Sequence, residues 1–362
     1  MKAAFRISDT FSTLLDFVRF LCSQGVVLSH LFIFFGFSGL FFTKMASYCV
    51  LMFFVLSGFL ISYSLRQHRL KNKDYSFSHF FKDRFFRIFP PFIAALVLVF
   101  ILDMVGFYFT GQYYSLTIYI QNFIINAFQL QEYPLATYLN EHYMIEFFRF
   151  HYFGTDLPLW TISIEWWLYM FYGFAVFFII KNTSVKWYHL IILIILSVTP
   201  VYYIFVSTRM DKGLTLYWFL GVIITFSRIL YVPNGSLPFI LNILLLVLGM
   251  FGFATFGYRT TIIIFFISLL LMTQTTSGHK TSFNQKTKKV ASALAGYSYS
   301  LFLIHYSIIY FIMNVFEFEH RVPQFIVVFL IVNIIAYFFA EMFEKNSKKL
   351  KSIYENYRSV KD

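Results

Sequence analysis

Arg19 and His30 are two ionisable residues inside the first long apolar segment of this 362-residue chain. They lie eleven residues apart, just over three helical turns, so both side chains fall on one helix face with about 16 Å of rise between them. Ionisable groups at membrane depth are costly and mark functional sites. Burial favours the neutral imidazole, so we expect His30 to accept a proton as a general base. The alternatives are a histidine satisfied by a neighbouring helix and a purely structural Asp16–Arg19 pair.

Arg84 and Arg87 lie in a basic and aromatic segment, Phe80–Pro91, at the start of the third apolar stretch. Three residues apart, they are neighbours on a helical turn and form a forked set of donors that suits phosphate oxygens. We therefore expect a phosphate-bearing cytosolic donor to bind there. Basic and aromatic residues beside a span also fix its orientation or contact anionic lipid, and that reading is the alternative.

A carboxylate, Glu165, lies inside the fourth apolar segment, which opens with Trp160 and Ser163. It lies about six residues into the span and so roughly 9 Å below the outer surface. His30 is expected at a similar depth, which would allow the two side chains to meet. The Trp and Tyr residues around Glu165 suit an interfacial belt, but a belt does not account for a carboxylate inside the span.

Tyr299 and His305 belong to a polar run, Gly296–His305, that leads into the ninth apolar segment from its cytoplasmic end. We expect Ser298 and Ser300 to hydrogen-bond to neighbouring helices. His305 lies about twelve residues into the segment and reaches the middle to outer membrane by helical rise. Three separate spans thus carry titratable groups to a similar depth.

The composition places these residues in a membrane. Hydrophobic residues make up 59% of the chain, aromatic residues 23% and charged residues 13%, which excludes a soluble surface. The formal charge of +12 gathers in clusters that satisfy the positive-inside rule with both termini cytoplasmic, so it indicates membrane orientation and not nucleic-acid binding. We predict an all-α bundle of ten transmembrane helices near 14–36, 46–65, 88–109, 159–180, 189–207, 214–231, 238–257, 260–275, 293–314 and 324–343.

The segment 115–131 is apolar enough to suggest a further span. A crossing there would invert every later basic cluster, so we expect a re-entrant or interfacial segment. The first apolar segment is too long for a cleavable signal peptide. Cys22 and Cys49 have neither metal-ligand nor redox spacing, and we expect no metal. We predict one membrane domain over residues 1–345 and a basic cytoplasmic tail over 346–362.

These segments together resemble the acyltransferase-3 family of membrane acyltransferases, whose members modify surface glycans and other exported hydroxyl compounds. The resemblance implies a ten-helix domain that takes an acyl group, usually acetyl from acetyl-CoA, on the cytoplasmic side and delivers it to an outward-facing acceptor. It extends in family order across nearly the whole chain and rests on Asp16–His30, Phe53–Leu60, Arg84–Pro91, Trp160–Tyr169 and Tyr297–His305.

The resemblance also implies residue roles. Arg19 and His30 match the essential pair of the first span. Arg84 and Arg87 match the paired arginines that engage the donor. Glu165 and the segment Tyr299–His305 would complete the site.

The chain departs from the family pattern in three ways. Two tryptophans follow Glu165, where many members carry a second carboxylate and a glutamine. Asn346 follows Glu344–Lys345 where the family continues with proline, so little weight falls on Glu344. We see no extracytoplasmic hydrolase-like domain of the kind many relatives append, so we expect direct acylation of the acceptor or a separate extracytoplasmic transferase.

We therefore expect an O-acetyltransferase of the cell inner (plasma) membrane, surrounded by membrane lipid, with an acyl-CoA donor and a carbohydrate or lipid-linked glycan acceptor. The identity of the acyl group is open, as is the choice between direct transfer and an acyl-histidine intermediate. One alternative is a transporter of a lipid-linked sugar or small anion, because intramembrane charges also mark transport pathways. Another is a structural subunit of a glycan polymerisation complex.

Overall fold

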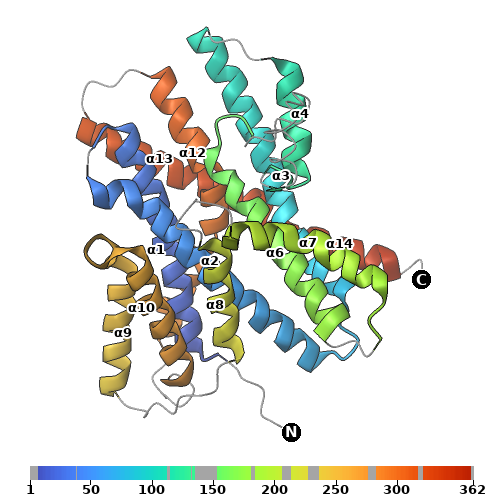
Figure 1. Cartoon of the computed structure of the whole chain (residues 1–362). Coiled ribbons are helices and arrows are strands. Elements are labelled where there is room, and N and C mark those ends of the chain that lie inside the picture. Colours follow the sequence, from blue (N-terminus) through green and yellow to red (C-terminus); the bar gives the residue numbers. More distant parts are fainter. Residues whose placement is uncertain are drawn as a thin grey trace. The chain divides into compact units, whose positions relative to one another are not determined.

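The fold is all-α throughout the part of the chain that the structure describes, which confirms the predicted class. A computed structural model describes residues 7–37, 39–111, 115–131, 133–134, 153–180, 184–205, 213–226, 236–275, 283–316 and 321–359. Within these ranges the regular elements are helices, without strands (Figure 1). The chain divides into two compact units, Met1–Asp74 with Thr208–Ser298 and Tyr75–Ser207 with Tyr299–Asp362.

Many of the helices have the length and composition of membrane spans. Seven of them, among the described residues, are long and apolar enough to cross a bilayer, and three shorter apolar helices accompany them. Each of the predicted apolar segments coincides with one of these helices. The chain is therefore a multi-pass membrane protein, while the count of ten spans and the cytoplasmic placement of both termini stay predictions.

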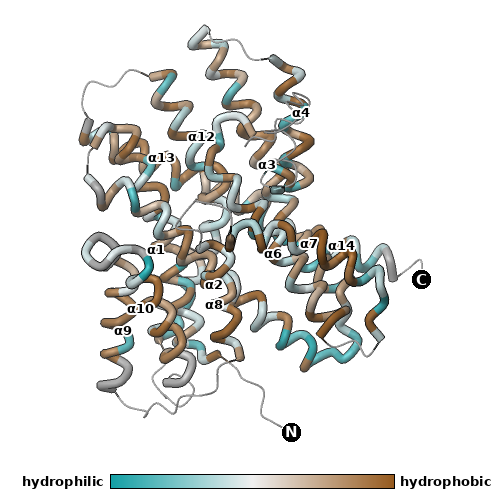
Figure 2. The backbone as a smooth tube through the Cα atoms, in the orientation of Figure 1, coloured by the Kyte–Doolittle hydropathy of each residue, from teal (hydrophilic) through white to brown (hydrophobic). Residues whose placement is uncertain are grey.

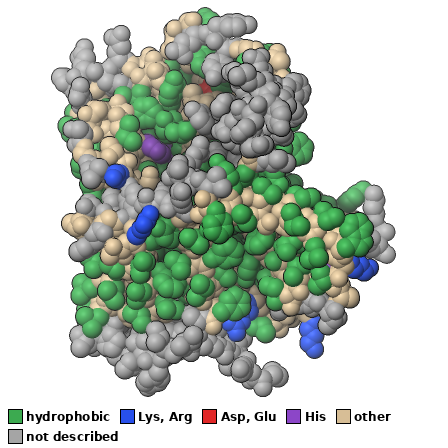
Figure 3. All heavy atoms as spheres, in the orientation of Figure 1, with side chains coloured by type: hydrophobic (Ala, Val, Ile, Leu, Met, Phe, Trp, Pro, Cys, Tyr) green, Lys and Arg blue, Asp and Glu red, His purple; other side chains and the backbone are tan. Residues whose placement is uncertain are grey.

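The surface of the helices supports the same conclusion. Figure 2 shows hydrophobic residues along much of α7 (Trp187–Phe205) and α9 (Ser236–Phe251). Large apolar side chains are exposed there, for example Ile194 at 65% and Phe205 at 71%. Figure 3 shows hydrophobic side chains over much of the visible face. Apolar surface on this scale marks contact with a membrane or another protein.

The first unit holds α1 and α2 together with the helices between Thr208 and Ser298. Helix α2 packs against α8 and α1, α9 packs against α10, and α11 packs against α1. The glycine at position 58 lets α2 approach α8 closely, because a Cβ there would lie 1.9 Å from the Trp218 carbonyl oxygen. The indole of Trp218 also donates to the Ser57 hydroxyl at 3.3 Å. The helices of this unit are α1 (Asp9–Phe34), α2 (Leu40–Lys71), α8 (Leu214–Phe226), α9, α10 (Phe253–Thr275) and α11 (Gln285–Ala295).

The second unit is built around α3, which packs against α6, α14 and the π-helix η5. Helix α4 has 12 residues, so it rises about 18 Å and is too short to span a hydrocarbon core of about 30 Å. The elements of this unit are α3 (Phe77–Thr110), α4 (Leu116–Ala127), η2 (Leu157–Leu159), α6 (Trp160–Phe174), η3 (Ala175–Ile180), α7, α12 (Ser298–Val315), α13 (Arg321–Phe339), η5 (Ala340–Glu344) and α14 (Lys345–Ser359).

A polar cluster ties the segment before α6 to the far end of α3. The Asp103 carboxylate accepts from the Thr155 amide at 3.0 Å, from the Thr155 hydroxyl at 2.6 Å and from the Tyr119 hydroxyl. Gly154 has a φ of +55°, and a Cβ there would lie 2.1 Å from the Asp103 carboxylate. Only glycine fits this position. The cluster thereby fixes the start of α6 and, with it, the position of Glu165.

Candidate functional site

The first unit carries the predicted residues of α1. Asp16 and Arg19 form an i, i+3 ion pair of 3.8 Å. His30 lies on the same continuous helix and is half-buried. The helix starts cleanly, because the Ser8 side chain accepts a hydrogen bond from the Phe11 amide at 3.1 Å and so caps its first turn. The predicted placement of Arg19 and His30 on one helix is confirmed.

Tyr297, the first residue of the last family motif, packs against α1. Its hydroxyl accepts a hydrogen bond from the Gln24 amide at 3.2 Å, and its ring lies 6.3 Å from the Phe20 ring. Both contacts fall between Arg19 and His30 along the helix. The motif thus begins in the first unit, while Tyr299 and the residues after it belong to the second.

Arg84 and Arg87 lie in the early turns of α3, in the second unit. Arg84 is only 6% exposed, its guanidinium stands 5.8 Å from the Phe80 ring, and its Nε has no hydrogen-bond partner. Arg87 is exposed. Neither arginine forms an ion pair with the residues that the structure describes. Burying a guanidinium is costly, and the neighbouring Asp83 carboxylate acts on Arg84 without forming an ion pair with it.

Glu165 is oriented by its own helix. The Tyr169 hydroxyl, one turn further along α6, donates a hydrogen bond to Glu165 Oε1. Tyr169 is in turn within electrostatic range of Arg84. Helix packing therefore brings the predicted carboxylate and the predicted donor-binding arginine into one neighbourhood.

Ser163 and Trp160 open the segment that carries Glu165, and we expect them to support the site. The Ser163 hydroxyl donates to the Gln129 carbonyl at 2.6 Å, and the Trp167 indole donates to the same oxygen at 2.8 Å. Gln129 has a φ of 58° in the turn after α4. Ser163 thus holds α6 against that turn. Trp160 is half-buried at the first position of α6.

Tyr299 connects the remaining elements of the second unit. Its hydroxyl donates to the Ile88 carbonyl on α3 at 3.3 Å. The charges of Glu165, Glu344 and Arg87 all act on this hydroxyl. The side chains of α3, α6, α12 and η5 therefore converge around Tyr299.

Glu344, where the chain departs from the family pattern, lies beside Tyr299 at the site. Its carboxylate accepts from the Ser300 hydroxyl at 2.8 Å and from the Ser300 amide at 3.3 Å. Glu344 ends the π-helix η5, and π-helical turns are frequent at functional sites. The family pattern places a proline after Glu344–Lys345, and this chain has Asn346 there. The incomplete motif therefore predicts no role for the Glu344 carboxylate.

His305 is fully buried in α12. Its Nδ1 lies 2.9 Å from the Leu301 carbonyl and 3.0 Å from the Phe302 carbonyl. These acceptors assign the proton to Nδ1 and leave Nε2 as the basic nitrogen. Nδ1 of His305 is thus hydrogen-bonded within its own helix.

An aromatic cavity of about 550 Å³ lies between α3, α6 and the end of α4. A cavity of this size and apolar character accommodates a small ligand. Its lining consists of Phe81, Phe85, Phe89, Pro90, Ile93, Ala127, Phe128 and Trp166.

The structure gathers part of the predicted site. Arg84, Arg87, Glu165 and Tyr299 lie within one unit, where the charges of Glu165 and Arg87 act on Tyr299 and the charge of Arg87 acts on Arg84. The predicted meeting of His30 with Glu165 joins residues of two units and stays a prediction.

The long apolar helices and the ionisable residues within them define a multi-pass membrane protein with a polar site. The chain belongs to the acyltransferase-3 family, because the family model, described as an acyltransferase domain, matches residues 13–341. The resemblance seen in the sequence is thereby confirmed, and the protein is a membrane acyltransferase. Comparisons with curated proteins and with solved structures gave no match.

Proposed function

We propose that this protein transfers an acyl group, with acetyl-CoA as the preferred donor, to a hydroxyl of a surface or exported carbohydrate, in the cell inner (plasma) membrane. The observation that carries the proposal is the pair Arg84 and Arg87. Both guanidinium groups lack an ion pair among the described residues, and one is buried. Two adjacent forked donors suit the phosphates of coenzyme A.

The aromatic cavity supplies the second element of donor binding. Phe85 and Phe89 stack with ring centroids 4.6 Å apart, and Phe89 meets Trp166 edge-on at 4.8 Å. These rings form an apolar wall beside the arginines on α3. The pantetheine arm and its acyl group would lie along this wall while the phosphates stay at the guanidinium groups.

The chemistry then requires a base and a group that orients the acceptor. His30 takes the proton from the acceptor hydroxyl, whose oxygen forms a bond to the thioester carbonyl carbon. The carbon–sulfur bond breaks and coenzyme A leaves as the thiolate. Glu165, held by Tyr169, orients the acceptor hydroxyl, and Arg19 guides the donor. No metal takes part in this scheme.

The acceptor is a carbohydrate or lipid-linked glycan. The acyl group passes to the acceptor directly or through an acyl-histidine intermediate. The protein either acylates the acceptor itself or acts together with a separate extracytoplasmic transferase. Labelled acetyl-CoA offered to inverted membrane vesicles tests the proposal. Covalently acetylated glycan is the expected product. Uptake of label without a covalent product would instead indicate a transporter and overturn the proposal.

A matched pair of histidine variants extends the test to cells. We expect His30→Ala to remove an acetyl-sized mass from the surface glycans, as deletion of the protein does. His68→Ala is the control, because His68 is exposed and its Nδ1 bonds to the Ser64 carbonyl of its own helix at 2.9 Å. Unchanged glycans in the His30→Ala strain, with the variant present in the membrane, would contradict the proposed role.

A further inference from the structure

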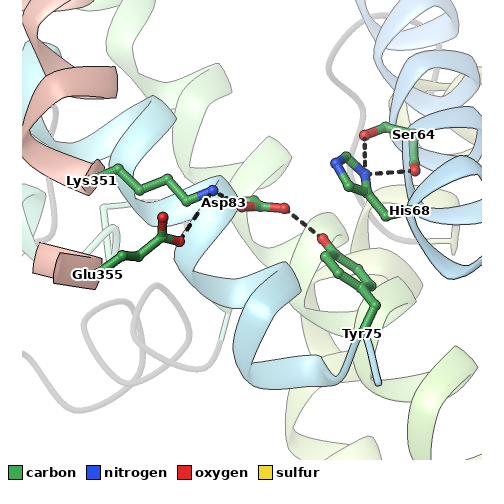
Figure 4. A network of polar contacts seen from close by, with 6 residues as sticks. All are labelled: Ser64, His68, Tyr75, Asp83, Lys351 and Glu355. Atoms are coloured by element: carbon green, nitrogen blue, oxygen red, sulfur yellow. Dashed lines mark hydrogen bonds and ion pairs between the residues drawn. The ribbon is translucent and has the colours of Figure 1, made fainter. Parts of the chain in front are cut away.

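Lys351 on α14 holds the carboxylate of Asp83 on α3 (Figure 4). The Lys351 ammonium lies 2.5 Å from Asp83 Oδ1, and the Tyr75 hydroxyl donates to Asp83 Oδ2 at 2.6 Å. Glu355, one turn along α14, lies 3.5 Å from the same ammonium. Both oxygens of Asp83 are thus occupied by groups other than arginine.

The Tyr75 hydroxyl stays protonated and donates a hydrogen bond to Asp83 in this network. Burial and the hydrogen bond to the Asp83 carboxylate raise the pKa of Tyr75, so its hydroxyl keeps its proton at neutral pH. The Asp83 side chain is 13% exposed. Asp83 is therefore held from two sides in a partly desolvated position, where charge-assisted hydrogen bonds are strong.

The sequence around Asp83 offers it a different partner. Arg87 follows Asp83 by four residues on α3, and an acid placed four residues before a base is the favourable orientation for an ion pair on a helix. Within the described residues this pair does not form, and Arg87 is exposed. The charge of Arg84, the residue next to Asp83, acts on the same carboxylate. Without Lys351, the Asp83 carboxylate is released to turn toward the two arginines on its own helix.

Helix α14 has other contacts with α3 that do not involve Lys351. The Tyr354 ring lies 5.5 Å from the Lys82 ammonium and 5.6 Å from the Phe86 ring. These contacts keep α14 docked when the Lys351 side chain is shortened. A variant at Lys351 therefore reports on the Asp83 carboxylate and not on the loss of the helix.

We propose that Lys351 is a positioning residue that diverts the Asp83 carboxylate away from Arg87 and Arg84, so that both guanidinium groups stay available to an anionic ligand. The inference rests on the proposed function in one respect, the identity of that ligand as the phosphates of an acyl-CoA. A carboxylate released from Lys351 turns to Arg87 and competes with the donor phosphates for it.

The test is a double-mutant cycle on acetyl transfer in membrane vesicles. Lys351→Ala is expected to raise the KM for acetyl-CoA by about threefold, the scale of a partly exposed helical ion pair, with kcat unchanged. Adding Asp83→Asn removes the competing charge, so the double variant returns toward the wild-type KM. Lys351→Arg keeps the pair and the wild-type KM. Lys349→Ala is the control, because it removes an exposed charge from the same helix.

The KM of the double variant shows whether Lys351 positions Asp83 or only supports the structure. If Lys351 only docks α14, removing Asp83 as well cannot help, and the KM of the double variant stays as high as that of Lys351→Ala. That result would overturn the inference. A wild-type protein that transfers no acetyl from acetyl-CoA would instead overturn the proposed function.

A second measurement keeps the inference testable without any enzymatic activity. Phenylglyoxal modifies accessible, unpaired guanidinium groups, and peptide mass spectrometry reads its reaction at Arg87. The modification is expected to be slower in Lys351→Ala than in wild type and to recover in the double variant with Asp83→Asn. An equal rate in all three proteins would overturn the inference whatever the donor proves to be.

Discussion

The Glu344 carboxylate accepts two hydrogen bonds from Ser300, one from its hydroxyl at 2.8 Å and one from its amide at 3.3 Å. Ser300 is in the first turn of α12, where backbone amides lack partners within the helix. A carboxylate at that end is also favoured by the helix dipole. Glu344 thus caps α12 from a residue 44 positions away, directly beside Tyr299.

The first prediction concerns this cap. Glu344→Ala leaves the Ser300 amide and hydroxyl without their acceptor, so the free energy of unfolding should fall by about 1–3 kcal/mol. Thermal unfolding in detergent measures the change. Glu341→Ala is the control, because Glu341 forms an exposed ion pair with Lys345, four residues later, and its removal should change the melting temperature little. Equal effects of the two substitutions would contradict the capping role.

The second prediction concerns the buried arginine of the donor site. Arg84→Ala should raise the KM for acetyl-CoA by about tenfold, the cost of losing charge-assisted hydrogen bonds to phosphate. Arg84→Lys should recover only part of this, because an ammonium lacks the forked geometry of a guanidinium. Steady-state kinetics in vesicles provide both values. Lys71→Ala, which removes an exposed charge at the end of α2, should behave as wild type.

The third prediction concerns the close approach of α2 and α8. Gly58→Ala should lower the melting temperature strongly, because its Cβ would lie 1.9 Å from the Trp218 carbonyl oxygen, an atom that cannot rotate away. Gly106→Ala is the matched control in α3, where the new Cβ would lie 3.5 Å from the nearest atom, on the Phe311 ring. Thermal unfolding followed by size-exclusion chromatography compares the two. A Gly58→Ala protein as stable as Gly106→Ala would refute the packing argument.

The fourth prediction concerns pH dependence through Asp156, just before η2. Burial and the neighbouring Asp103 carboxylate raise the pKa of Asp156 well above its ordinary value of about 4. The folded protein therefore holds a proton that the unfolded chain has already lost, and the free energy of unfolding falls as pH rises from about 4 toward the raised pKa. Above that pKa the folded protein buries an ionised carboxylate, and the free energy of unfolding is lowered by the full cost of this burial.

Asp156→Asn replaces the protonated acid with a neutral group of similar shape and should remove this penalty. The variant is expected to melt at a higher temperature than wild type at neutral pH, with the difference shrinking as pH falls toward 4. Melting curves at a series of pH values measure the trend. Asp74→Asn is the control, since Asp74 is exposed. A difference independent of pH would show that Asp156 is not protonated in the folded state.

Much of the candidate site was predictable from residue type and spacing. Arg84 and Arg87 were recognised as adjacent donors, and Glu165 and Tyr299 as polar groups inside apolar segments. In the structure the charges of Glu165 and Arg87 act on Tyr299, and Tyr169 lies within electrostatic range of Arg84. Tyr169 was read only as part of an interfacial belt, because a tyrosine in an apolar segment carries no sign of its hydrogen-bond partner.

The sequence alone determined the helical class, the apolar segments and the chemistry of the individual side chains. These features are local, since a helix satisfies its own backbone within four residues and a membrane requires a set length of apolar chain. Only the tertiary structure decided which polar groups pair. Glu344 reaches Ser300 across 44 residues and Lys351 reaches Asp83 across 268. Such pairs depend on how whole helices pack, and the free energy of that packing is spread over many side chains that no short motif records.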